Sequence, residues 1–184
     1  MISPDLKALA TRFARTTWIL WFGFTFAPVI YAVLQWVLVR GRPEGTPPRM
    51  PSGSALPEEA IYVAILVAII SGPVLAWVVI PRMYPLAKLI ASGQAQLVGN
   101  FGEDQPRYER LSETEKKKAG MFGAIQTLYI IRWACVESVA IYGFVAFMMG
   151  VADMYTAWGF IVASIVLLVM LRPNYEAELE KLPN

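Results

Sequence analysis

The sequence contains no histidine and a single cysteine. Without histidine there can be no histidine-ligated haem or zinc, no Ser-His-Asp triad and no histidine-based proton switch. The lone Cys135 excludes an internal disulfide and any cysteine-ligated cluster. We therefore expect no metal site and no cofactor, and carboxylates, arginines and lysines are the strongest chemical groups that remain.

Charge is also scarce. Charged residues make up 16% of the 184-residue chain, against about 25% in a typical soluble domain. The net charge of +2 is too small to indicate nucleic acid binding. The sequence shows no nucleophile–base arrangement and no phosphate-cradling loop, so we do not expect an enzyme.

What the chain does contain is four long apolar runs, within a composition that is 57% hydrophobic. Each run is close to the roughly 20 residues that a helix needs to cross about 30 Å of hydrocarbon. The pattern predicts an all-α integral membrane protein, a single membrane domain over residues 1–184. We expect four transmembrane helices at residues 18–39, 61–80, 128–150 and 155–171.

Basic residues indicate how these spans are oriented. Twelve lysines and arginines lie in the N-terminal segment, the loop 81–120 and the tail, whereas only three lie between the first and second runs. Because positive charge stays cytoplasmic, we expect both termini and the loop 81–120 inside and the Pro-rich loop 41–59 outside. This interpretation places the chain in a bacterial cytoplasmic (inner) membrane. Its expected partners are the lipid bilayer and other membrane subunits or further copies of the chain.

Two helices show start signals ahead of their apolar runs. Ser3 followed by Pro4 is typical of a helix N-terminus, and an apolar stripe leads from there into the first span. Ser112 followed by Glu115 resembles a capping box, which predicts that the third helix starts near Glu113, well before the bilayer.

Glu137 is the one acidic residue deep inside an apolar run. It lies nine residues after Leu128, which is about 13 Å along a helix and close to the middle of the membrane. An ionised carboxylate at that depth is costly, and such residues usually face protein or water and are functional by default. A carboxyl group that can be charged or neutral can load and release a proton or a small cation.

The alternative is that Glu137 only joins helices together. Arg132 is the possible charge partner, but a spacing of five residues places the two side chains on different faces of a helix. Arg132 also lies near the cytoplasmic end of its run, where its long side chain can reach the interface.

The segment that follows Glu137 carries a resemblance to a known family. Glu137-Ser138-Val139-Ala140-Ile141-Tyr142-Gly143-Phe144-Val145 resembles the ion-binding helix of rotary ATPase c subunits, the proteolipids. The resemblance covers residues 133–149 and implies that Glu137 binds a proton or cation. It also implies that Ser138 and Tyr142 support the carboxylate.

Two further patterns concern how the spans pack. Aligning Thr16 with Thr127 places Tyr31 on Tyr142, which agrees with two duplicated helical hairpins; chance similarity between aromatic-rich spans is the other interpretation. In the second span, small residues recur every fourth position and indicate a close helix–helix interface, with Pro73 expected to kink the helix beside Gly72. These helix-packing residues are Ala60, Ala64, Ala68, Gly72 and Ala76.

The sequence thus predicts a multi-pass subunit of an oligomeric membrane complex with a buried proton- or cation-binding carboxylate, Glu137. The alternative is a structural or assembly subunit in which Glu137 makes only an interhelical ion pair or hydrogen bond.

Overall fold

The computed structural model describes residues 3–41, 58–83 and 104–174, and all regular structure in these ranges is helical. In chain order the elements are α1 (Pro4–Arg40), α2 (Glu58–Val74), the π-helical turn η1 (Leu75–Val79), α3 (Ile80–Met83), α5 (Gln105–Glu109), α6 (Glu113–Met148) and α7 (Met154–Met170). Much of the predicted loops 41–59 and 81–120 falls outside the described residues.

Within the described ranges, three helices are long and apolar enough to cross a membrane: α1, the segment Ile65–Arg82 and α6. The remaining apolar helix, α7, has 17 residues and is shorter. An all-helical protein with an integral membrane location fits these lengths and compositions.

The predicted starts of the two longest helices are confirmed. Ser3 caps α1, and its hydroxyl oxygen accepts a hydrogen bond from the Leu6 amide at 3.2 Å. Ser112 and Glu115 form a complete capping box at the start of α6, in which the Ser112 amide donates to Glu115 Oε2 at 3.2 Å. Both helices therefore begin well before their apolar runs.

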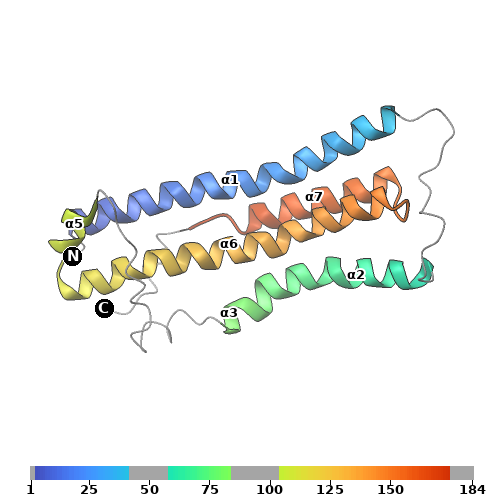
Figure 1. Ribbon diagram of the computed structural model, residues 1–184. Coiled ribbons are helices and arrows are strands. Elements are labelled where there is room, and N and C mark those ends of the chain that lie inside the picture. The colour runs from blue at the N-terminus through green and yellow to red at the C-terminus, as the bar shows by residue number, and fades with distance from the viewer. Residues whose placement is uncertain (1–2, 42–57, 84–103, 175–184) are drawn as a thin grey trace.

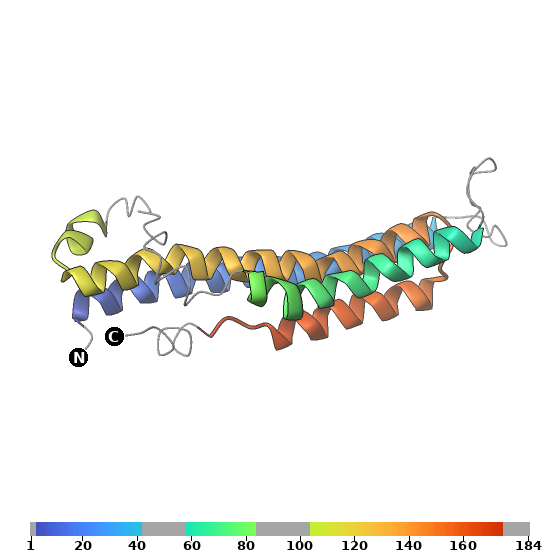
Figure 2. The same cartoon turned by 90° about the horizontal axis from the view of Figure 1, so that it is seen from below.

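The helices α1 and α6 run side by side in the same direction (Figure 1). Their aromatic side chains meet in register, with ring centroids 5.5 Å apart for Phe13 and Phe122 and 5.8 Å apart for Phe24 and Trp133. After a tight turn, α7 returns antiparallel and packs on both helices, while α2 packs on α6 (Figure 2). The central helix of the bundle is therefore α6.

The molecule has two parts along its length. We call residues 3–17 and 104–127 the stalk, and the remaining described residues the four-helix segment. With 37 residues, α1 is about 55 Å long, so it extends beyond a hydrocarbon layer of about 30 Å. The stalk core is formed by Leu6 and Leu9 of α1 and Phe122 and Ile125 of α6.

Both ends of α7 are held by specific contacts. Gly150, with φ 73°, makes the turn out of α6, and the Asp153 carboxylate caps α7 by accepting from the Thr156 amide at 2.7 Å. At the other end, the indole N–H groups of Trp21 and Trp133 donate to backbone carbonyls of Leu168 and Leu171 at 2.9 and 3.0 Å. The Leu168 carbonyl also accepts from the Leu171 amide at 3.1 Å, so the two indoles add donors at the end of the helix, where backbone carbonyls run out of partners along the chain.

The helix changes type just after Pro73. Pro73 has no amide hydrogen and removes one hydrogen bond from the preceding turn. The π-helical turn η1 begins two residues later, at Leu75. Such turns insert one extra residue per turn and are frequent at functional sites.

Candidate functional site

Glu137 lies on α6 and faces α1. Its Oε1 atom accepts a hydrogen bond from the Tyr31 hydroxyl at 3.1 Å, and the side chain is half-buried. The Tyr31 ring stacks on Phe144, with centroids 5.7 Å apart and the rings 29° from parallel. Side chains on a helix lean toward its N-terminus, and this direction lets Tyr31 reach back to the level of Glu137. A neutral donor, held in place by an aromatic stack, therefore contacts the carboxylate.

Arg132 is held on another side of α6. Its Nε atom donates to the backbone carbonyl of Ala76 in η1 at 2.9 Å. The predicted charge partner thus contacts the second span, whereas the hydrogen bond of Glu137 goes to the first. A π-helical turn changes the pairing of its backbone groups, and the guanidinium of Arg132 supplies a donor there.

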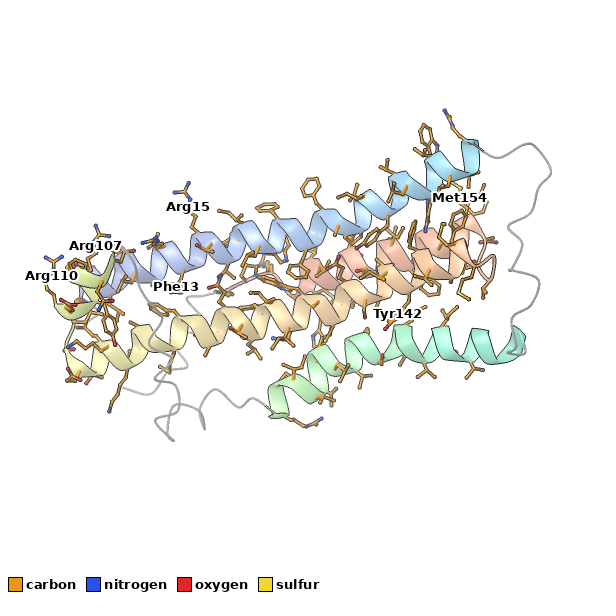
Figure 3. All side chains as sticks on the ribbon, viewed as in Figure 1. Phe13, Arg15, Arg107, Arg110, Tyr142 and Met154 are labelled. Carbon is orange, nitrogen blue, oxygen red and sulfur yellow. The ribbon has the colours of Figure 1, made fainter. Side chains whose placement is uncertain are left out.

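Ser138 and Tyr142, which the resemblance places around Glu137, lie toward the second span. The Ser138 hydroxyl donates to the Cys135 carbonyl at 2.7 Å, and a side chain at Gly72 of α2 would touch it. Tyr142 projects from α6 on the side where α2 runs (Figure 3) and is 37% exposed. The structure therefore brings Tyr31, rather than Ser138 or Tyr142, to the carboxylate.

The small-residue stripe meets α6 at two described positions. A Cβ atom added at Gly72 would lie 2.2 Å from the Cys135 carbonyl oxygen, so the two backbones are in direct contact there. Ala76 is fully buried. The side chains of Ala60, Ala64 and Ala68 lie outside the described residues. A close approach of this kind is the usual way in which helices associate in lipid.

Gln35 is a second polar residue that the sequence analysis did not assign to a site. It is fully buried, and neither its Nε2 nor its Oε1 atom makes a hydrogen bond within the described part of the chain. It lies four residues after Tyr31, so both side chains share one face of α1. The face of α1 that meets Glu137 therefore carries two polar groups in succession.

Among the described residues, no group of three or more histidines, cysteines, aspartates and glutamates could hold a metal ion. The chemistry that this arrangement can perform is proton or monovalent cation exchange at one carboxyl group. The Tyr31 hydroxyl can donate to the carboxyl when it is ionised and can accept from it when it is neutral.

We compared the chain with protein-family models, with curated proteins and with solved structures, and none of the three comparisons found a match.

Proposed function

We propose that this protein is a subunit of an oligomeric membrane complex in which Glu137 binds and releases a proton or a small monovalent cation. The observation that carries the proposal is the hydrogen bond from Tyr31 to Glu137. The carboxylate is held by a neutral hydroxyl from a different helix, so no fixed charge on that partner locks it in the ionised form.

The half-buried position of Glu137 also supports this proposal. A fully enclosed carboxyl could not exchange its proton, and a fully lipid-exposed one would be too costly to ionise. On one side Tyr31, whose ring stacks on Phe144, covers the carboxyl, and the exposed part is available to water or to a neighbouring subunit. The resemblance to rotary ATPase c subunits assigns the same role to Glu137.

The proposal includes four transmembrane helices, with α7 as the fourth, and both termini and the stalk in the bacterial cytoplasm. The parallel packing of α1 and α6 agrees with two duplicated hairpins. Lipid-facing apolar side chains on α1, α2 and α7 leave room for further subunits or copies of the chain.

A second candidate function rests on different contacts. Gly72 packs directly on the α6 backbone, and Arg132 of α6 donates a hydrogen bond to η1. The closely packed spans can therefore serve as a rigid surface on which neighbouring helices assemble. In a structural or assembly subunit, the bond between Tyr31 and Glu137 would serve only to join α1 to α6. This function predicts that a glutamine at position 137 is tolerated, because its amide oxygen still accepts from Tyr31.

Chemical labelling in native membranes separates the two functions. A hydrophobic carbodiimide reacts with protonated carboxyl groups that it reaches from the lipid. We expect modification at Glu137, located by mass spectrometry, and its complete loss in Glu137→Gln while the native mass of the complex stays unchanged. Glu113→Gln, which removes an exposed carboxyl in the stalk, is the control and should leave the labelling intact. Absence of labelling in the wild-type complex would favour the structural role.

A further inference from the structure

Gln35 differs from the other buried polar side chains of the protein. Among the described residues these are Thr17, Asp104, Ser164 and Gln35. Thr17 donates to the Phe13 carbonyl, Ser164 donates to the Val136 carbonyl, and Asp104 accepts from arginines. Only Gln35 is both fully buried and, within this part of the chain, without a hydrogen bond. A buried amide is costly unless its donors and acceptor are satisfied.

The burial of Gln35 limits what can satisfy it. Its exposed fraction is 0% in the single chain, so a neighbouring subunit or a lipid headgroup cannot reach the amide. A partner must be small enough to enter between the helices. A water molecule fits this requirement because it both donates and accepts, as the amide does.

The position of Gln35 connects it to one end of the bundle. Trp21 meets Leu168 of the antiparallel α7, so moving fourteen residues along each helix brings Gln35 level with Met154, the first residue of α7. Figure 3 shows Met154 at the end of the bundle where α6 turns into α7, beside the last turns of α1. Gln35 is also only five residues from the end of α1, about 8 Å along the helix axis.

The face of α1 that carries Gln35 also carries Tyr31, which contacts the carboxyl group of Glu137 on α6. Tyr31 lies one turn before Gln35, about 6 Å along the axis, and its hydroxyl donates to Glu137. Both side chains lean toward the N-terminus of α1, so each one points toward the next group. Gln35, Tyr31 and Glu137 thus form a succession of polar groups from the α6–α7 turn to the middle of the membrane.

We infer that Gln35 binds water on an access route that carries protons between the α6–α7 end of the bundle and Glu137. This inference rests on the proposed function of Glu137 and adds the side of the membrane from which the carboxyl is reached. In the proposed orientation that side is the outer one. The Gln35 amide holds the water, and the Tyr31 hydroxyl passes the proton to or from the carboxyl.

The single cysteine of the chain makes a direct test possible. In the full-length protein in vesicles, Cys135→Ala removes the native thiol, and Gln35→Cys places a thiol at the proposed water site. Silver ions, added only on the side of the α6–α7 turn, react with thiols that water reaches. Unreacted thiols are then counted with a maleimide after unfolding.

Two control positions make the result specific. Ile161→Cys is equally enclosed, at 3% exposure, and also replaces a side chain larger than cysteine, whereas Val33→Cys faces the lipid at 54% exposure. We expect Gln35→Cys to react several-fold faster than both controls, and faster from the turn side than from the side of the termini. Equal rates at Gln35→Cys and Ile161→Cys would overturn the inference.

A second variant tests the route to Glu137. Gln35→Leu keeps the approximate size and removes an amide that makes no hydrogen bond to the described part of the chain, so we expect it to fold. Hydrogen–deuterium exchange at the Glu137 carboxyl can be followed by infrared spectroscopy. We expect this exchange to be several-fold slower in Gln35→Leu and unchanged in Ser164→Ala. Exchange at the wild-type rate in Gln35→Leu would refute the route while carbodiimide labelling of Glu137 still upheld the proposed function. If the wild-type protein were not labelled at Glu137, both the proposed function and the access route would be refuted.

Discussion

Polar groups are paired in different ways in the stalk and in the four-helix segment. In the stalk, charged side chains pair with one another: Asp104 binds both Arg12 and Arg107. In the four-helix segment, hydroxyl, indole and guanidinium donors go to backbone carbonyls, as Ser164, Trp21 and Arg132 do. Ion pairs suit a region in water, whereas in lipid each backbone group must be satisfied inside the protein.

Exposed apolar side chains follow the same division. Among the described residues, every large hydrophobic side chain that is exposed lies in the four-helix segment, beginning at Trp18 on α1 and at Ile131 on α6. In the stalk, the corresponding side chains are buried or half-buried, and exposed positions such as Arg15 carry charge and point away from the bundle (Figure 3). This division agrees with an integral membrane location, because large exposed apolar surface is unusual in water.

The largest effect is expected from breaking the packing in the four-helix segment. Gly72→Ala places a methyl group against the Cys135 carbonyl, and we expect a loss of about 1–3 kcal/mol or more, as overpacking produces. Unfolding in detergent, followed by circular dichroism during titration with sodium dodecyl sulfate, measures it. Gly23→Ala is the matched control, because nothing lies within 4 Å of its added Cβ. An equal effect of the two variants would contradict the close approach.

The second-largest effect is expected from breaking the polar centre of the stalk. Asp104→Ala leaves Arg12 and Arg107 without their shared carboxylate. Because the two arginine side chains are 54% and 50% exposed, solvent screening limits the expected loss to about 1–2 kcal/mol. Limited proteolysis should show faster cleavage in the stalk and unchanged resistance of α7. Glu109→Ala, at an exposed stalk position, should change little, and faster cleavage within α7 of the Asp104 variant would argue against two separate regions.

A smaller effect is expected at the end of α7. Trp133→Phe keeps the aromatic packing but removes the indole donor to the Leu171 carbonyl, which should cost about 1 kcal/mol. Hydrogen exchange should increase in the last turn of α7. Trp18→Phe on an exposed side of α1 serves as the control, and identical exchange in both variants would speak against the indole cap.

The smallest effect concerns pH at the stalk. Hydrogen bonds from the Ser3 side chain and backbone, and from Ser112, lower the pKa of Glu115 from 4.5 to about 2. Because this pKa is depressed in the folded protein, its stabilising contribution is complete above pH 4.5 and is lost as the pH falls toward about 2. Amide protection near Ser3 and Ser112 should decrease over that interval and become independent of it in Glu115→Gln. If amide protection in the wild-type protein were undiminished near pH 2, the stability of this region would not depend on the ionisation of Glu115.

The comparison also shows which features the sequence could predict. Local signals predicted the starts of α1 and α6, because a cap involves residues three positions apart. The contact between Tyr31 and Glu137 could not be predicted in the same way, because it depends on how α1 and α6 pack. The alignment of Thr16 with Thr127 does not give this contact, because it matches Tyr31 with Tyr142 rather than with Glu137. The tryptophan caps of α7 likewise depend on three helices meeting.

The proton chemistry of Glu137 is the central claim, and infrared spectroscopy tests it most directly. A neutral carboxyl group has its own C=O stretching band, and the difference between wild type and Glu137→Gln assigns that band. We predict that the assigned band appears and disappears reversibly as pH is varied over the range in which the complex stays folded, and that Tyr31→Phe shifts the band. A Glu137 signal that stays constant across this range, in wild type and in Tyr31→Phe, would contradict the proposal.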